Sequence, residues 1–377
     1  MPVVGSPQAR TTLRLAYLDG LRALAATYVV GFHAVLGFAS KDLTGAWRLL
    51  RRTFAFGHEA VAVFIVLSGY CLMLPVVRSQ PSMLSVALGR FVRRRAMRIL
   101  PPYFAALGLS IGLLALVPAL RMRSGTIWDD SLPGLDAGAI ASHLLLVHNW
   151  SKAWGYQING PLWSVASEWQ IYFFFPLLLL PLWRRFGMLA ALTVAAVVGY
   201  APLLFARSSA MVAIPWYLLL FAFGMAAAAI GFAPDGLPAR LRAARWGLWS
   251  TASWIFCFAF GMGAASIWFR FKPMADLLVG IATTTLLLNL TGQTASAKRG
   301  ALLRFLESRP LVAVGHFSYS LYLTHLPVLA LGYFALRPLG LSTATLALLL
   351  LTLGAVVSLL VAYAFHVVIE RRFIQRR

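Results

Sequence analysis

The stretch LDGLRALAATYVVGFHAVLGFA, residues 18–39, decides the fold class of this chain. Arg22 and His33 stand eleven positions apart in it, so on a helix they share one face, about 16 Å apart along the axis. An arginine at the middle of a bilayer costs about 2.5–3.5 kcal/mol, so a membrane helix keeps such groups where they face a polar interior. The stretch therefore predicts a membrane-spanning helix that carries part of a site.

The composition predicts that the rest of the chain is membrane-embedded as well. Of its 377 residues 60% are hydrophobic, and 33 Lys and Arg stand against 11 Asp and Glu, which gives a net charge of +22. The basic excess lies between the apolar blocks, where it suits anionic lipid headgroups better than nucleic acid. Cys71 and Cys257 lie in apolar segments and have neither disulfide nor metal-site spacing. We predict an all-α polytopic protein of the lipid bilayer, with no nucleic-acid partner and no metal.

Apolar blocks of 18 residues or more predict about ten transmembrane helices in a single membrane domain over residues 1–377. Their expected ranges are 21–39, 59–77, 101–120, 161–183, 187–206, 211–232, 246–268, 274–292, 311–336 and 343–369. The distribution of Lys and Arg between these blocks predicts that both termini are cytoplasmic, although the basic loop 40–58 runs against it. Asp19, Arg22 and His33 argue against a cleaved signal peptide at the N-terminus.

Two segments between the blocks have patterns of their own. Residues 82–100 predict an interfacial amphipathic helix that stops at Pro101-Pro102. The longest outer segment, 121–160, predicts either a lid or acceptor-binding surface or an interfacial aromatic belt. Its polar and aromatic residues are Asp129, Asp130, Asp136, His143, His148, Trp150, Trp154 and Tyr156.

Glu168 is the most informative acidic residue within a predicted span. With Ser164 and Ser167 it forms one polar stripe on a helix, near the outer leaflet, where the topology also puts His33. A carboxylate that meets an imidazole can fix its tautomer and stabilise its charged form, so we expect Glu168 to orient His33. A serine stripe that serves helix packing is the alternative.

Three arginines predict a phosphate site at the cytoplasmic side. Arg95 and Arg98 share a helix face there, and Arg22 lies at the inner end of the first span. Guanidinium groups match phosphate oxygens in geometry and charge, although a basic run that anchors the chain to lipid fits the pattern too. If phosphates dock at these arginines, a long flexible arm can lie along the first helix toward His33.

Other polar residues in or beside the spans leave two interpretations open. His325, in the middle of a predicted span, suits either the site or a structural hydrogen bond between helices. Glu370 is expected to form a local salt bridge at the inner surface. His58 and Glu59 look like outer-surface residues, and Ser68 suits close helix packing better than a role as nucleophile.

Six stretches, taken in order, resemble the motifs of the acyltransferase 3 family, which are bacterial integral-membrane O-acyltransferases. They are LDGLR (18–22) followed by His33, VFIVLSGY (63–70), RAMRILPPY (95–103), LWSVASEWQIY (162–172), FSYSLYLTHLP (317–327) and IER (369–371). Each stretch is weak alone, but together they cover nearly the whole chain. Two positions depart from the family pattern, since Arg372 replaces a proline and Trp169 replaces a second glutamate.

The resemblance implies a single-module enzyme of the bacterial inner membrane that transfers an acyl group from acyl-CoA, most simply acetyl-CoA, to a hydroxyl. Family acceptors are sugars of surface glycans and antibiotics such as macrolides, so a sugar or polyketide hydroxyl is expected. His33 would be the general base, with Glu168 orienting its ring and His325 as a supporting or oxyanion group. The CoA phosphates would be held by three arginines: Arg22, Arg95 and Arg98.

Two alternatives stay open at this point. In a relay, the acyl group rests on His33 before it reaches the acceptor. A proton-coupled transporter or flippase of a surface-glycan precursor can use the same polar residues as a proton or substrate path, although the sequence shows no repeated halves. Consumption of acyl-CoA by the purified protein distinguishes the enzyme from the transporter.

Overall fold

The computed structural model describes residues 15–36, 45–78, 88–123, 134–206, 211–233, 236–296 and 299–374. Within these ranges the regular structure is helical throughout and contains no strand. The longer helices are α1 (Ala16–Leu36), α3 (Gly57–Arg78), α4 (Leu88–Leu116), α6 (Leu162–Phe174), α7 (Leu180–Tyr200), α10 (Tyr217–Phe232), α12 (Trp246–Gly263), α14 (Lys272–Ala295), α17 (Ser318–Leu336) and α19 (Ala355–Phe365). The predicted all-helical fold class is confirmed.

Shorter helical pieces connect or extend these helices. The α-helical pieces are α2 (Gly45–Thr53), α5 (Ala137–Leu144), α8 (Pro202–Phe205), α11 (Gly236–Leu241), α13 (Ala265–Arg270), α15 (Ala301–Leu306), α16 (Arg309–His316), α18 (Thr343–Leu349) and α20 (Arg371–Ile374). Three are 3₁₀ turns, η3 (Pro118–Arg121), η5 (His148–Trp150) and η7 (Arg337–Leu339). Three are π-helical turns, η6 (Phe175–Leu179), η8 (Leu350–Gly354) and η9 (His366–Glu370).

Six helical stretches in the described ranges are long and apolar enough to cross a membrane. They are Gly45–Arg78, Leu88–Leu116, Leu162–Phe205, Lys272–Ala295, Ser318–Leu339 and Thr343–Ile374. The chain is therefore built as a multi-pass membrane protein. The expected number of ten spans and the side of the two termini stay predictions.

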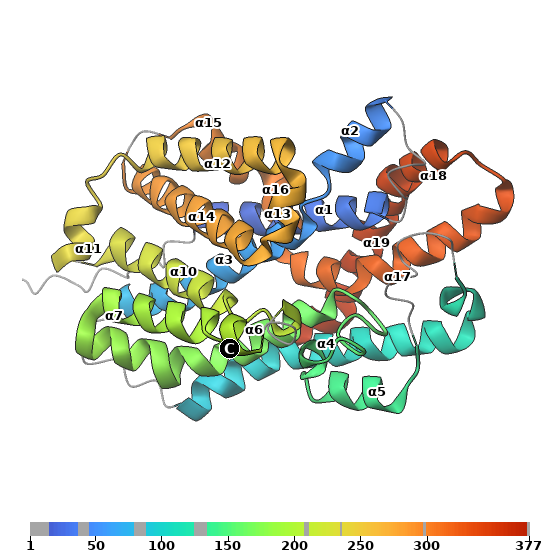
Figure 1. The fold of residues 1–377 in the computed structure, drawn as a ribbon, viewed down its shortest axis with the longest axis horizontal. Helices are drawn as coiled ribbons and strands as arrows, with labels where there is room; N and C mark the ends of the chain where they lie inside the picture. Colours follow the sequence, from blue (N-terminus) through green and yellow to red (C-terminus); the bar gives the residue numbers. More distant parts are fainter. Residues whose placement is uncertain are drawn as a thin grey trace, which may run out of the picture.

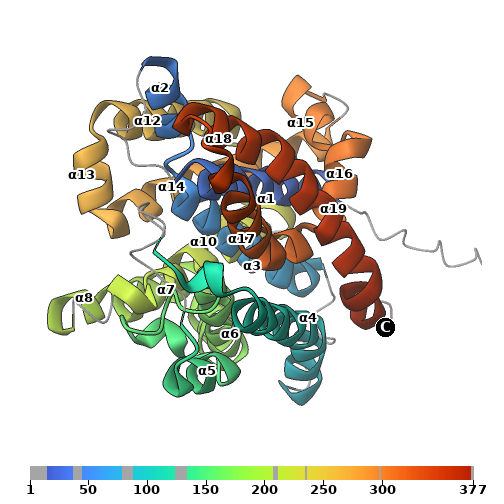
Figure 2. The same ribbon diagram turned by 90° about the vertical axis from the view of Figure 1, so that its right-hand side faces the viewer.

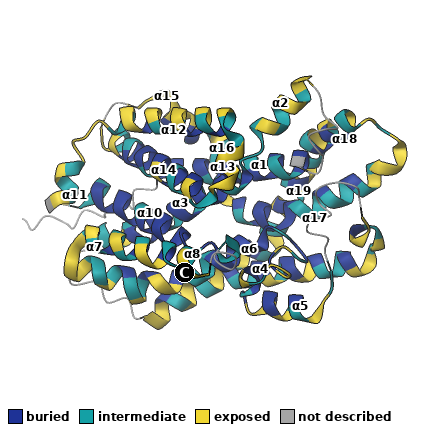
Figure 3. Cartoon of the chain, viewed as in Figure 1, coloured by how far each residue is buried: buried dark blue, intermediate teal, exposed yellow. Residues whose placement is uncertain are grey.

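The helices form a central group surrounded by an outer layer (Figures 1 and 2). Helices α1, α3, α10, α14 and α17 lie in the middle, and α3 packs along α10. Figure 3 shows the buried residues gathered on these helices, while much of α7 and α12 faces outward. The outer faces carry large apolar side chains: Phe186, Leu189, Val197, Ile255, Phe256, Phe258, Val356 and Leu360. Apolar surface on this scale suits lipid as the solvent.

Two glycines let the central helices α3 and α10 approach closely. A Cβ on Gly224 would overlap the Val66 carbonyl oxygen and lie 2.6 Å from the Tyr70 nitrogen. A Cβ on Gly69 would overlap the Phe221 carbonyl oxygen in the same way. Small residues at a crossing allow such backbone contact in membrane bundles. The expected packing role for this part of α3 is thus observed at Gly69.

Helix α4 differs from the prediction of a stop at Pro101-Pro102. It runs without a break from Leu88 through both prolines to Leu116. Each proline removes a donor, but in a membrane helix neighbouring groups can satisfy the freed carbonyls. The carbonyls that lose their donor are those of Met97 and Arg98. The Tyr319 hydroxyl donates to the next carbonyl, that of Ile99, at 3.1 Å, so α17 packs on α4 beside them. The basic stretch around Arg95 therefore shares one helix with the apolar segment that follows it.

Two breaks shape the remaining helices. Gly187 has φ +85°, a left-handed conformation that suits glycine, and it separates the helices predicted at 161–183 and 187–206. Phe317, with φ −114° and ψ 18°, ends α16 and precedes α17. The predicted helix over 311–336 is therefore two helices, which places His325 in α17.

Candidate active site

His33 of α1 and His325 of α17 meet in the structure. His325 Nε2 lies 3.0 Å from His33 Nδ1, and the ring centroids are 4.9 Å apart. His33 Nδ1 also lies 3.0 Å from the Val29 carbonyl oxygen, and His325 Nδ1 lies 3.0 Å from the Leu321 carbonyl oxygen. His325 is fully buried, whereas His33 is half-buried. Residues 292 positions apart thus form one imidazole pair.

The hydrogen bonds assign the protons of this pair. A carbonyl oxygen only accepts, so both Nδ1 atoms carry hydrogen when the rings are neutral. His325 Nε2 then accepts from the Nδ1–H of His33, which it shares with the Val29 carbonyl. His33 Nε2 is left with a free lone pair and can take a proton. This is the arrangement that a general base with an orienting partner requires.

Glu168 contacts other groups than His33. Its Oε1 accepts hydrogen bonds from the Ser68 hydroxyl and, at 2.5 Å, from the Tyr172 hydroxyl. The first turn of α6 packs on α17 near Tyr322, so Glu168 lies farther along α6, beside Ser68 of α3. The orienting contact that we expected Glu168 to make with His33 is thus made by His325. Glu168 instead contacts Tyr172, which lies beside Arg95.

The arginine end consists of Arg22 and Arg95 with Cys71 and Tyr172 between them. Arg22 donates to Asp19 Oδ1 and to Cys71 Sγ, both at 2.9 Å. The Arg95 guanidinium lies 6.0 Å from the centroid of the Tyr172 ring. Both guanidiniums are within electrostatic range of Cys71 and Tyr172. Two arginines from helices far apart in sequence therefore gather, as expected for an anion site.

Arg95 and Arg98, which the sequence predicts to share one face of a helix, differ in their exposure. Arg95 is half-buried, and its Nε has no hydrogen-bond partner among the described residues. Arg98 is exposed on the same helix. Arg95 therefore points into the bundle, while Arg98 remains at its surface.

The serine stripe of α6 links this end to the histidine pair. Ser164 is 2.7 Å from the Tyr322 hydroxyl, and the Tyr322 ring lies 5.9 Å from the His325 ring. The Ser167 hydroxyl accepts from the Asn149 amide at 3.0 Å. A line of polar side chains thus runs along α6 between the two ends.

The segment 121–160, which the sequence predicts to lie on the outer side, is folded against the bundle where it is described. Asp129 and Asp130 lie outside the described residues. Asp136 caps α5 by accepting from the Ala139 nitrogen, and the fully buried His143 and His148 rings stack with centroids 3.7 Å apart. The aromatic side chains that remain exposed are Trp150, Trp154 and Tyr156.

Acidification is expected to loosen this segment. Burial lowers the pKa of His143, and burial together with the neighbouring His143 ring lowers the pKa of His148 to about 3. Unfolded histidines take protons near pH 6.5, so below that pH the unfolded state binds more protons and the free energy of unfolding falls, by up to about 1.4 kcal/mol per pH unit for each ring. Melting temperatures measured from pH 7 to pH 5 should therefore fall. His148→Phe, which keeps a ring but does not titrate, should flatten that slope, and an unchanged slope would contradict this account.

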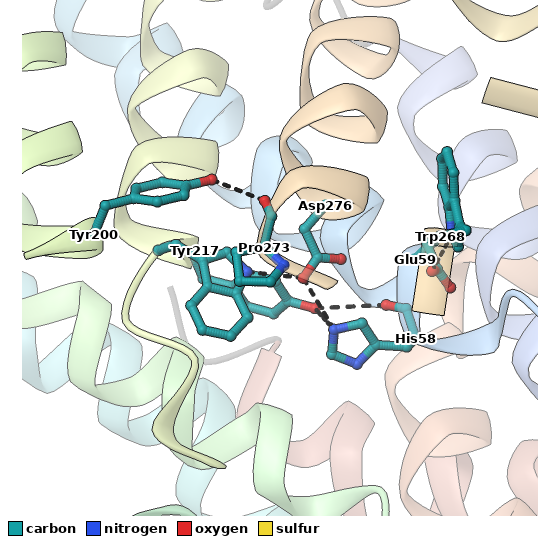
Figure 4. Close-up of polar contacts among 8 residues, drawn as sticks. His58, Glu59, Tyr200, Tyr217, Trp268, Pro273 and Asp276 are labelled. Carbon is teal, nitrogen blue, oxygen red and sulfur yellow. Dashed lines mark hydrogen bonds and ion pairs between the residues drawn. The ribbon is translucent and has the colours of Figure 1, made fainter. Parts of the chain in front are cut away.

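A second buried polar cluster surrounds His58 and Asp276 (Figure 4). His58 Nε2 lies 3.0 Å from Asp276 Oδ2, and the Trp216 indole donates to the same oxygen at 2.8 Å. The Trp268 indole donates to Glu59 at 2.6 Å. Glu59 is 6% exposed and Asp276 is fully buried. The expectation that His58 and Glu59 are outer-surface residues is therefore wrong.

This cluster also touches the candidate site. The His58 ring stacks on Trp163 with centroids 5.3 Å apart, and Trp163 precedes Ser164 of the polar stripe. The Tyr217 hydroxyl lies 3.1 Å from His58 Nε2. An acid within an apolar block, such as Asp276, was a visible signal in the sequence, but its partners were not. Within the described residues, no group of three or more His, Cys, Asp or Glu is placed to hold a metal ion.

Comparisons with known proteins agree with the helical architecture and the motifs. A family model described as an acyltransferase domain matches residues 15–367. "Acyltransferase MdmB" from Streptomyces mycarofaciens is 30% identical over 169 residues, which cover 44% of this chain and 39% of that protein. The match therefore spans well under half of the relative's length. No solved structure matches the chain significantly. Since the family model covers nearly all of the sequence, the chain belongs to the acyltransferase 3 family of acyl-transferring enzymes.

Proposed function

We propose that this protein is an O-acyltransferase of the bacterial inner membrane that moves an acetyl or longer acyl group from acyl-CoA to a hydroxyl. The acceptor hydroxyl belongs to a glycan or to a glycosylated small molecule such as a macrolide. The observation that carries the proposal is the His33–His325 pair, which leaves one basic nitrogen free inside an acyltransferase bundle. In this proposal residues 1–377 form one membrane domain with ten spans and cytoplasmic termini, so the arginine end faces the cytoplasm.

The base is assigned to His33. Its Nε2 takes the proton of the acceptor hydroxyl as the hydroxyl oxygen attacks the thioester carbonyl. The carbon–sulfur bond then breaks, and the proton passes from His33 to the departing sulfur, which gives the ester and free CoA. The positive charge that develops on His33 is shared with His325, which accepts from its Nδ1–H. A positioned base of this kind contributes about 10²- to 10⁴-fold in rate.

The donor is assigned to the arginine end. Arg22 and Arg95, with Arg98 at the surface, supply charge for the CoA phosphates. The two ends of the site are separated by about 16 Å along α1, which suits a donor with a long flexible arm. Glu168 is assigned to holding Tyr172 beneath Arg95, through the hydrogen bond between them.

The experiment that tests this function uses the purified full chain in detergent. Incubation with labelled acetyl-CoA and an acceptor panel, methyl β-D-glucopyranoside, a lipid-linked glycan and erythromycin, should release free CoA and label an acceptor. Saturating CoA should also slow the alkylation of Cys71 by N-ethylmaleimide severalfold, because Arg22 holds this thiol at the donor site. Mass spectrometry reads each cysteine separately, and the buried Cys257 in α12 is the internal control.

The alternative function, a transporter or flippase, makes the opposite prediction. It leaves acetyl-CoA unconsumed with every acceptor and leaves the alkylation rate of Cys71 unchanged by CoA. That combined result would overturn the proposed function.

A further inference from the structure

A cavity of about 300 Å³ lies beside the arginine end and is lined by none of the residues assigned so far. Its walls come from α16 and Phe317 on one side and from α19, η9 and α20 on the other. Its lining residues are Ala313, His316, Phe317, Tyr363, His366, Val367 and Arg371. Three of these are basic and none is acidic, so the cavity suits an anion.

Each of the two histidines of the cavity lies beside a carboxylate that does not line it. His366 Nδ1 lies 2.8 Å from Glu370 Oε2, and the buried Glu370 also accepts from the Ser320 hydroxyl at 2.5 Å. His316 Nε2 lies 3.6 Å from Asp19 Oδ2. Neither carboxylate lines the cavity. The two imidazoles are thus oriented by acids outside it, while Arg371 is exposed at its edge.

The cavity is connected to the donor site through Asp19. This carboxylate pairs with Arg22 through Oδ1 and with His316 through Oδ2. One acidic side chain therefore stands between a residue assigned to the donor phosphates and a residue of the cavity wall. The cavity and the arginine end are therefore adjacent, with Asp19 between them.

Aromatic rings form much of the remaining wall. The Phe317 and Tyr363 rings have centroids 5.7 Å apart at 73°, and Phe317 also lies 6.4 Å from the His366 ring. Flat apolar faces beside an arginine and two imidazoles match a ligand that joins an aromatic base to a phosphate. A phosphomonoester also complements the planar fork of Arg371.

We propose that this cavity binds the adenosine 3′-phosphate end of the donor, while Arg22 and Arg95 bind its pyrophosphate. This inference rests on the proposed function, because it concerns the same acyl-CoA donor. The phosphate of an anionic lipid headgroup shares part of this chemistry, and the ligands used in the test separate the two sources.

The test compares two ligands that differ by one phosphate. Isothermal titration of the full chain in detergent should show that coenzyme A binds at least tenfold more tightly than 3′-dephospho-coenzyme A. Arg371→Gln should weaken binding of coenzyme A by about tenfold to one-hundredfold, as expected for loss of a charge-assisted contact. It should change binding of the dephospho form less than threefold. The neighbouring exposed arginine gives the matched control, and Arg372→Gln should bind both ligands as the unmodified protein does.

Several results would overturn the inference while leaving the proposed function intact. These are equal weakening of both ligands by Arg371→Gln, no weakening of either, or equal affinities of the unmodified protein for the two ligands. Loss of binding to phosphatidylglycerol vesicles by Arg371→Gln, with coenzyme A unaffected, would assign the cavity to a lipid headgroup. Failure of the unmodified protein to bind coenzyme A at all would instead overturn the proposed function.

Discussion

His33→Ala is expected to lower kcat for acyl transfer by about 10²- to 10⁴-fold. The hydrogen bonds of the histidine pair leave His33 Nε2 as the nitrogen that can take a proton, so its removal eliminates the base. Alanine cannot replace it, and the buried His325 has its Nδ1 engaged by the Leu321 carbonyl. The measurement is the rate of free CoA release from acetyl-CoA with an acceptor that the unmodified protein acylates.

A graded control accompanies this variant. His325→Gln should lower kcat by less, about tenfold, because it removes a hydrogen bond to the base rather than the base itself. CoA should still protect Cys71 from alkylation in both variants, since Arg22 lies about three turns away from His33 along α1. Transfer by His33→Ala at close to the normal rate, with protection intact, would show that another group is the base.

Gly224→Ala is expected to destabilise the protein by about 3 kcal/mol or more, the upper range for overpacking in a close-packed core. The added methyl group would overlap the Val66 carbonyl in the backbone of α3, which cannot turn aside as a side chain can. The helices α3 and α10 must therefore separate along a crossing that buries much of both. Thermal unfolding in detergent, followed by circular dichroism, measures the loss.

Two glycines in open surroundings serve as control positions for the substitution of Gly224. Gly108 in α4 and Gly292 in α14 have no atom within 4 Å of an added Cβ, so their alanine variants should melt at or above the normal temperature. If the melting temperature of Gly224→Ala equals that of these controls, the close approach of α3 and α10 does not contribute to stability in the way we describe.

The central helix α1 could be predicted from sequence because its evidence is local. Two basic residues on one face of an apolar run predict both a helix and its inward side, and α1 covers both. The stop at Pro101-Pro102 was wrong for a related reason, since proline rules describe a helix in isolation. In a bundle the helix can continue, because packing against neighbouring helices stabilises it even where proline leaves a carbonyl without its donor.

The site could be predicted only in part, because partners are set by packing between distant segments. His33, His325 and Glu168 are polar residues in apolar stretches of the sequence, which predicts that they face the interior, and all three lie in the bundle. Which of them touch could not be found from spacing, since His33 and His325 are 292 positions apart. The same holds for Asp276, whose partner His58 is 218 positions away.

The cluster around Glu59 has a consequence for biosynthesis. Glu59 lies in an early helix, and the indole that bonds it, Trp268, is 209 positions later in the chain. At about 5–20 residues per second, a ribosome needs about 10 to 40 s to supply that partner. Until then the nascent carboxyl group has to stay hydrated or be sheltered by the insertion machinery. Helix α3 is therefore synthesised before the indole that bonds Glu59 in the folded protein exists.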